Sequence, residues 1–158
     1  MKHGHRGTIL LVEDEVVIAT AEKAVLEKHG YTVIVAGTGE RALGIFCAQS
    51  SVDLAVLDIN LGTGIDGVET ARYLLRIREL PILFLSSFPV EEIERLTQDI
   101  PAYRLSKPCT NVRLVKTVET ALPRPAQGQS SVTKRVGVSR SDDNLETRCQ
   151  SICQSGQL

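Results

Sequence analysis

The sequence is poor in several features that mark particular classes of protein. It contains no tryptophan, and aromatic residues make up 4% of its 158 residues, so a core must be built mainly from aliphatic side chains. No run approaches the roughly 18 apolar residues of a membrane-spanning helix, and the stretch between Arg6 and Glu13 is too short for the apolar part of a signal peptide. We therefore expect a cytoplasmic protein that does not enter a membrane.

Two further absences argue against particular classes of function. The formal net charge is −1, so the chain lacks the basic excess by which proteins bind nucleic acid electrostatically. The four cysteines do not show the paired C-x-x-C spacing of a zinc site. The composition therefore argues against a nucleic-acid-binding protein and against a structural zinc protein.

A regular alternation of two patterns fills most of the chain. Hydrophobic residues make up 42% of the sequence, which is enough for one domain with its own core. Short apolar runs, often β-branched, alternate with segments whose apolar residues recur at helical spacing. The predicted strands lie at 8–12, 31–36, 52–60, 81–85 and 102–106, and the predicted helices at 16–29, 38–47, 68–79, 90–97 and 112–122. This alternation predicts an α/β protein with a doubly wound parallel sheet.

The composition divides the chain into three parts. Residues 1–7 are polar and are expected to form a flexible leader, whereas 8–122 hold the whole alternation of strands and helices. Beyond Pro123 the chain is rich in polar residues and has too little apolar matter for a second core. We therefore expect 123–158 to be a disordered tail or a linker.

Residues capable of chemistry follow four of the predicted strands. Glu13 and Asp14 follow the first strand, and Asp58 closes the third. Ser86 follows the fourth strand and Lys107 the fifth. Because parallel strands end at the same edge of a sheet, these side chains should converge there. Carboxylates are preferred ligands of Mg²⁺, and hydroxyl and ammonium groups donate to phosphate oxygens, so the set favours a site for a phosphoryl group and a divalent metal.

This ordered set of acids, hydroxyl and lysine resembles the receiver (CheY-like) domain of two-component response regulators. Its members, in chain order, are Glu13-Asp14, Asp58, Ser86 and Lys107-Pro108. The resemblance covers about residues 8 to 122. It implies a five-stranded parallel sheet in the flavodoxin-like order 2-1-3-4-5, with five flanking helices. It also implies a signalling phosphoacceptor rather than an enzyme, one that supports its own magnesium-dependent phosphoryl transfer and dephosphorylation.

The resemblance further implies a role for each residue of the set. Asp58 would take a phosphoryl group from a histidine kinase in a phosphorelay and become an aspartyl phosphate, while Lys107 and Ser86 contact the phosphoryl oxygens. The implied ligands of Mg²⁺ are Glu13, Asp14, Asp58 and the backbone carbonyl of Asn60. The implied partners are a sensor histidine kinase or a phosphotransfer protein, with a second copy or an output partner at the last two helices.

Two local features depart from the usual pattern of the family. Receivers commonly carry a proline shortly after the phosphoacceptor, whereas this chain has Gly62 and Gly64 there, in a loop one residue longer. An aromatic residue commonly stands three positions before the lysine, and here that position is Arg104. Tyr103 would point to the opposite face of the strand, so we expect it to pack in the core rather than to act as a switch. A receiver-shaped interaction module that works without phosphorylation is the alternative function.

Other interpretations explain less of the pattern. The acids at 13–15 could simply begin a helix, where the helix dipole favours negative charge, but this leaves Asp58 and Lys107 unexplained. A haloacid-dehalogenase-type phosphatase needs a second acid two residues after its nucleophile, and that position is Asn60. A flavodoxin-like flavin binder needs a hydroxyl-rich loop after the first strand, where this chain has three acids that would repel phosphate.

Overall fold

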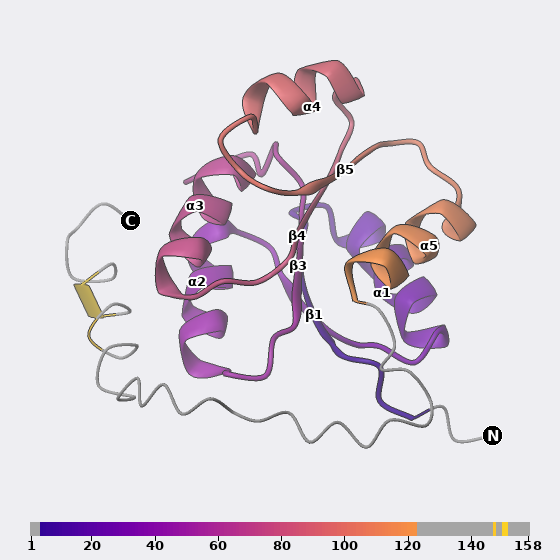
Figure 1. Cartoon of the computed structure of the whole chain (residues 1–158), viewed down its shortest axis with the longest axis horizontal. Coiled ribbons are helices and arrows are strands. Elements are labelled where there is room, and N and C mark those ends of the chain that lie inside the picture. Colours follow the sequence, from indigo (N-terminus) through magenta and orange to yellow (C-terminus); the bar gives the residue numbers. More distant parts are fainter. Residues whose placement is uncertain (1–3, 123–146, 148–149, 152–158) are drawn as a thin grey trace.

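The chain folds into five strands, each followed by a helix (Figure 1). The structure is a computed structural model and describes residues 4–122, 147 and 150–151. The strands are β1 (Thr8–Val12), β2 (Thr32–Ala36), β3 (Leu54–Leu57), β4 (Ile82–Ser86) and β5 (Tyr103–Ser106). The helices are α1 (Val16–Lys28), α2 (Gly39–Ala48), α3 (Gly67–Ile77), α4 (Val90–Leu96) and α5 (Asn111–Ala121). The predicted alternation is confirmed, with bounds that differ by a few residues.

All five strands are parallel and form one sheet in the order β2-β1-β3-β4-β5. This is the order that the resemblance implied, so the predicted fold is confirmed. The strand order reverses beside β1, because β2 lies on one side of it and β3 on the other. Sheets of this kind bind ligands beyond the carboxyl ends of the strands at such a reversal. The topology therefore points to the ends of β1 and β3.

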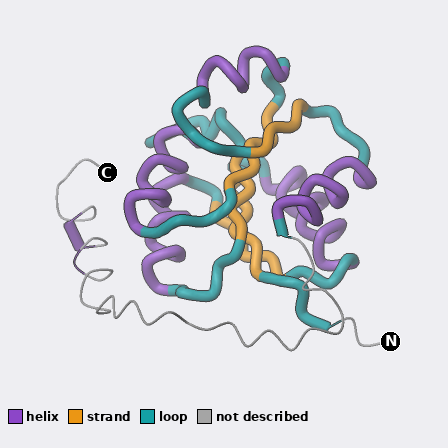
Figure 2. The backbone as a smooth tube through the Cα atoms, viewed as in Figure 1, coloured by secondary structure: helices purple, strands orange, loops and turns teal. Residues whose placement is uncertain are grey.

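Helices cover both faces of the sheet (Figure 2). α2 and α3 pack on one face and α1 and α5 on the other, while α4 stands beside the edge strand β5. Every residue of β1, β3 and β4 is buried, because these inner strands have neighbours on both sides and helices on both faces. The edge strands β2 and β5 each include partly exposed residues.

The core is aliphatic, as the composition predicted. Leu10, Leu57 and Leu74 belong to the hydrophobic cluster beneath α2 and α3, and Leu26 and Val118 to the cluster beneath α1 and α5. Burying a leucine or valine side chain contributes about 1.5–3 kcal/mol relative to leaving it in water. The two clusters thus hold the helices against the sheet and fix the strand ends relative to one another.

Three helices begin at residues whose side chains cap them. Thr38, Asp66 and Thr110 each accept a hydrogen bond from the backbone N–H three residues further on, at 3.2, 2.8 and 3.2 Å respectively. Such a cap contributes typically about 1 kcal/mol. The cap at Asp66 also fixes the end of the loop that starts at Asp58, so it bears on the site described below.

The expectation that Tyr103 packs in the core is wrong. The residue is 39% exposed and borders a surface pocket together with Arg113 and Lys116 of α5. β5 is an edge strand, and α5 covers Leu105, two residues further along the same face, but leaves Tyr103 partly open. An alternating strand pattern does not show where the covering helix ends.

Arg104 binds the connection between α4 and β5. Its guanidinium donates to the hydroxyl and the carbonyl oxygen of Thr97, at 2.7 and 2.9 Å. It also donates to the carbonyl oxygens of Ile100 and Ala102, at 3.0 and 2.8 Å. The planar guanidinium thereby satisfies backbone carbonyls that lie outside regular secondary structure, which an aromatic ring at this position could not do.

The predictions for the two ends of the chain fall largely outside the described residues. The leader predicted at 1–7 is described from residue 4 onward, and of the tail predicted at 123–158 the structure describes residues 147, 150 and 151. None of the helices formed by described residues is both long and apolar enough to span a membrane.

Replacing Gly67 with alanine is expected to destabilise the protein, because α3 begins directly against the backbone of Asp58. A Cβ at position 67 would lie 1.9 Å from the carbonyl oxygen of Asp58, so the backbone itself has to move. We expect Gly67→Ala to lower the free energy of unfolding by about 3 kcal/mol, the upper end of the usual cost of overpacking. Urea-induced unfolding measures this change.

Gly44→Ala is the matched control for this prediction. Gly44 lies on an exposed part of α2, where a Cβ meets no other atom within 4 Å. Alanine is favoured over glycine inside a helix by roughly 0.5–1 kcal/mol, so this substitution should raise the free energy of unfolding. Similar effects of the two substitutions would contradict the role assigned to the close approach at Gly67.

Candidate functional site

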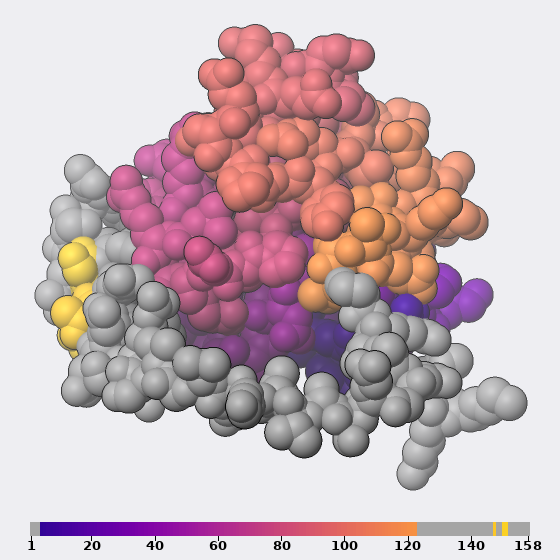
Figure 3. Space-filling view, viewed as in Figure 1, coloured from indigo at the N-terminus to yellow at the C-terminus, as the bar shows by residue number. Residues whose placement is uncertain are grey.

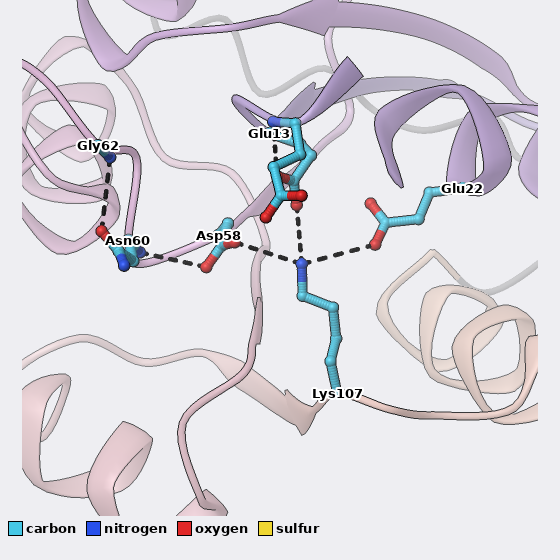
Figure 4. A network of polar contacts seen from close by, with 7 residues as sticks. Glu13, Glu22, Asp58, Asn60, Gly62 and Lys107 are labelled. Atoms are coloured by element: carbon cyan, nitrogen blue, oxygen red, sulfur yellow. Dashed lines mark hydrogen bonds and ion pairs between the residues drawn. The ribbon is translucent and has the colours of Figure 1, made fainter. Parts of the chain in front are cut away.

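Four strands deliver polar residues to one edge of the sheet. β1 and β3 are paired so that Glu13 and Asp58 follow neighbouring strand ends. β4 and β5 are paired up to Ser86, and Lys107 comes directly after the last pair. Glu13, Asp58 and Lys107 point toward one another (Figure 4). The structure therefore brings these residues together, as their positions after the strands predicted.

The ammonium group of Lys107 lies at the centre of this cluster. It donates hydrogen bonds to Oε2 of Glu13 at 2.8 Å and to Oδ2 of Asp58 at 3.3 Å. A third carboxylate, that of Glu22 in α1, lies 3.9 Å away on the side opposite Asp58 (Figure 4). The Lys107 side chain is only 14% exposed, so water screens these interactions weakly.

The cluster holds more negative than positive charge. Burial disfavours the charged form of Lys107, but the hydrogen bond to Glu13 and the charges of Asp58, Glu13 and Glu22 outweigh it, so the pKa of Lys107 is raised. Burial also raises the pKa of Glu13, although Lys107 opposes that shift. One ammonium group thus faces three carboxylates, and the carboxylate of Asp14 lies nearby. Such an excess of negative charge attracts a divalent cation.

Three of the acids are placed closely enough to bind one metal ion. Carboxylate oxygens of Glu13, Asp14 and Asp58 all lie within 4.8 Å of one another. Hard oxygen ligands of this kind suit Mg²⁺. The backbone N–H of Asn60 donates to Oδ1 of Asp58 at 3.2 Å, which orients that carboxylate, whereas the place of the Asn60 carbonyl among the ligands stays a prediction.

A pocket of about 280 Å³ opens beside these acids, and Ser86 contributes an unpartnered hydroxyl to it. The pocket is lined by Asp14, Glu15, Asp58, Asn60, Gly62, Ser86, Ser87 and Phe88. Ser86 is 1% exposed, and among the described residues its Oγ finds no hydrogen-bond partner. A buried hydroxyl without a partner is costly, and an anionic oxygen in the pocket would satisfy it. This orphaned donor fits a phosphoryl group.

Comparison with known proteins agrees with this geometry. A family model described as the response regulator receiver domain matches residues 9–119. The chain belongs to this family. Receiver domains bind Mg²⁺ at an acidic cluster, and the acids at 13, 14 and 58 form such a cluster here.

Similar proteins and structures place the receiver domain among response regulators. The phyllosphere-induced regulator PhyR of Methylorubrum extorquens is 31% identical over 115 residues, which are 72% of this chain and 43% of that protein. The N-terminal domain of a response regulator/sensory box/GGDEF protein from Carboxydothermus hydrogenoformans is 38% identical, with a TM-score of 0.68 over 73% of this chain and 93% of that one. The chemotaxis protein CheY4 of Vibrio cholerae is 25% identical, with a TM-score of 0.67 over 73% and 98% of the two chains.

The chain spans less than half the length of the first curated relatives that it matches, since it covers between 33% and 43% of them. What those longer proteins do as a whole is therefore not transferred to this receiver domain by similarity alone. The shared part is the receiver domain itself.

Glu22 is a member of the site that sequence reasoning did not find. It stands on α1 between Ile18 and Leu26, each four residues away, so it interrupts the apolar stripe of the helix with a carboxylate. That interruption is the signal that could have found it. Burial raises the pKa of Glu22 from its ordinary value of 4.5 to about 7, and the charges of Glu13 and Asp58 add to the shift while Lys107 opposes it.

Glu22→Gln is expected to change how the stability of the receiver domain depends on pH. The pKa of Glu22 is near 7 in the folded protein, so Glu22 ionises at a lower pH in the unfolded chain than in the folded protein. Wild type therefore loses stability as the pH rises from about 4.5 to about 7. The variant lacks this loss. The free energy of unfolding of the variant minus that of wild type should therefore be about 1–3 kcal/mol larger at pH 8 than at pH 4.5. This range allows for the partial exposure of Glu22.

Urea-induced unfolding at both pH values, with EDTA present to remove divalent cations, measures this difference. An offset between Glu22→Gln and wild type that is the same at pH 4.5 and pH 8 would contradict the raised pKa of Glu22.

Proposed function

We propose that Asp58 is a phosphoacceptor that takes a phosphoryl group from the phosphohistidine of a sensor histidine kinase or a phosphotransfer protein. The observation that carries the proposal is the arrangement around its carboxylate. Lys107 lies 3.3 Å away, and the pocket beside it contains the unpartnered hydroxyl of Ser86. Both are donors suited to phosphoryl oxygens.

In this proposal the carboxylate of Asp58 acts as the nucleophile. One of its oxygens attacks the phosphorus atom, the bond from phosphorus to the histidine nitrogen breaks, and the electron pair of that bond stays with the imidazole. The product is an acyl phosphate on Asp58. Attack of water on the same phosphorus would later break its bond to the Asp58 oxygen, release inorganic phosphate and restore the carboxylate, so the receiver would support its own dephosphorylation.

Lys107 and Ser86 would stabilise the negative charge on the transferred group. Lys107 would turn from Glu13 and the Asp58 carboxylate toward a phosphoryl oxygen, and the hydroxyl of Ser86 would donate a hydrogen bond to another phosphoryl oxygen. Transfer of this kind depends chiefly on positioning and electrostatics, which these two donors supply.

Mg²⁺ would be held by Glu13, Asp14, Asp58 and the backbone carbonyl of Asn60. When bound, the ion supplies positive charge that screens the carboxylates from the incoming phosphoryl oxygens. The excess of carboxylates over ammonium groups at this edge supports the proposal, because without such screening a dianionic group would be repelled.

The new charge at Asp58 would act on a partner-binding surface. Phosphorylation adds about one to two negative charges at neutral pH. α4 protrudes at one end of the molecule (Figure 3), and β5 contacts both α4 and α5. We propose this face as the place where a second copy or an output partner binds. We also propose that 8–122 form the receiver unit, with 1–7 as its leader and 123–158 as a tail or linker, and that the protein is cytoplasmic.

The proposal predicts that the protein becomes phosphorylated by a small phosphodonor. Incubation with acetyl phosphate and Mg²⁺ should add one phosphoryl group, roughly 80 Da by intact-mass analysis. The gain should disappear when EDTA removes Mg²⁺ and in Asp58→Asn. A folded wild-type protein that gains no mass would instead support the alternative, an interaction module that works without phosphorylation.

Ser86→Ala should slow phosphorylation without destabilising the protein. The hydroxyl has no partner among the described residues, so its removal should leave the free energy of unfolding unchanged or raised. Loss of its bond to a charged phosphoryl oxygen, worth about 1.5–3 kcal/mol, should slow phosphorylation by acetyl phosphate roughly 10- to 100-fold. Ser51→Ala, at an exposed position far from the pocket, is the control that should do neither. A lower stability of Ser86→Ala with an unchanged rate would contradict the assigned role.

A further inference from the structure

Glu40 ties the loop between Asp58 and α3 to the first turn of α2. The backbone N–H of Ile65 donates a hydrogen bond of 2.9 Å to Oε1 of Glu40. The carboxylate also lies against Gly64, since a Cβ at that position would come within 2.3 Å of the same oxygen. Glu40 therefore contacts two successive residues of the loop.

The close approach of α2 to the loop depends on Gly39, which precedes Glu40. A Cβ at position 39 would lie 2.6 Å from Cγ1 of Ile65 and 2.1 Å from Oγ1 of Thr70 in α3. The missing side chain thus lets the first turn of α2 lie directly against the loop and against α3. This approach brings the carboxylate of Glu40 within reach of the loop backbone.

The other hydrogen bonds of the loop run within it or to its own flanking elements. The N–H of Asn60 donates to Asp58 at 3.2 Å, and the N–H of Gly62 donates to the side chain of Asn60 at 3.5 Å. Among the hydrogen bonds found in the part of the chain that the structure describes, the one to Glu40 links residues 60–66 to an element other than β3 and α3. Among the described residues, Glu40 thus supports the loop by a hydrogen bond from outside it, in addition to the apolar packing of Leu61 and Ile65 in the core.

The position of this loop decides the geometry of the acidic cluster. Gly62 has a φ of +70°, and its backbone passes so near Asp14 that a Cβ there would lie 3.1 Å from Oδ2. Asn60, on the same loop, carries the backbone carbonyl of the proposed ligand set. A shift of the loop would therefore move this carbonyl and, at the same time, displace the carboxylate of Asp14.

We propose that Glu40 is a positioning residue for Mg²⁺, an inference that rests on the proposed function. By holding the far end of the loop, it keeps Asn60 and Asp14 at the separation that the metal requires. Gly62 and Gly64 leave the loop backbone free to vary, and Glu40 restrains it from outside. Groups that orient metal ligands without binding the metal commonly change its affinity about 10- to 100-fold.

Mg²⁺ binding measured by isothermal titration calorimetry tests this role with three substitutions of Glu40. Glu40→Asp keeps the negative charge but is one methylene too short to reach Ile65, whereas Glu40→Gln loses the charge but keeps an oxygen that can accept the same hydrogen bond. Glu40→Ala loses both. We expect Glu40→Asp and Glu40→Ala to bind Mg²⁺ about 10-fold more weakly than wild type, and Glu40→Gln to bind it about as tightly.

Glu91→Ala is the matched control, because Glu91 is an exposed acid in the first turn of α4 and carries the same favourable charge relative to a helix dipole. It should bind Mg²⁺ as wild type does. Thermal unfolding in EDTA shows whether each variant is folded, and Glu40→Asp provides the test should Glu40→Ala fail to fold.

The possible outcomes separate this inference from the proposed function. Equal Mg²⁺ affinity of wild type, Glu40→Asp and Glu40→Ala would overturn the role of Glu40 and leave the proposed function intact. Weak binding by Glu40→Gln with normal binding by Glu40→Asp would also overturn it, since charge rather than position would then matter. Wild-type protein that binds no Mg²⁺ would overturn the proposed function, and the inference with it.

Discussion

The structure depends on one ammonium group that neutralises carboxylates gathered by a parallel sheet. Parallel strands end at the same edge, so the acids that follow β1 and β3 are forced together. Glu13 is buried, and its charge is tolerable because Lys107 hydrogen-bonds it at 2.8 Å. Removing one partner of such a buried pair typically costs about 3–5 kcal/mol, because the other charge stays behind without compensation. The same pairing links the residue after β5 to residues at the ends of β1 and β3, across the intervening strand β4.

This constraint also explains why the edge suits a phosphoryl group. The fold supplies two donors at this edge. The ammonium group of Lys107 is shared among several carboxylates, and the buried hydroxyl of Ser86 has no hydrogen-bond partner in the part of the chain that the structure describes. Both donors could form hydrogen bonds to a group with negatively charged oxygens. Away from the edge, Arg104 stabilises the connection between α4 and β5 through four hydrogen bonds, in the place where receivers commonly carry an aromatic residue. In this chain the surface beside α4 is therefore held by polar contacts to the backbone.

The sequence predicts the fold and the principal members of the candidate site because both follow from order along the chain. Apolar runs alternating with helical stripes fix a parallel sheet, and the residues after each run then have to meet at its edge. Contacts made by residues inside helices are harder to foresee. Glu22 interrupts an apolar stripe and Glu40 looks like an ordinary helical acid, but neither pattern names a partner. Tertiary packing turns Glu22 toward Lys107 and Glu40 toward Ile65. The exposure of Tyr103 also depends on tertiary packing, because a strand pattern does not reveal how far α5 covers the strand.

A crystal structure of the protein with Mg²⁺ and beryllofluoride, which mimics a phosphoryl group on a carboxylate, tests the central claim most directly. The account predicts beryllium bonded to a carboxylate oxygen of Asp58, with the ammonium of Lys107 and the hydroxyl of Ser86 each on a fluorine. It predicts Mg²⁺ beside Asp14. Beryllofluoride absent from Asp58, with Lys107 still bound to Glu13 and Asp58 and with Ser86 still unpartnered, would contradict it.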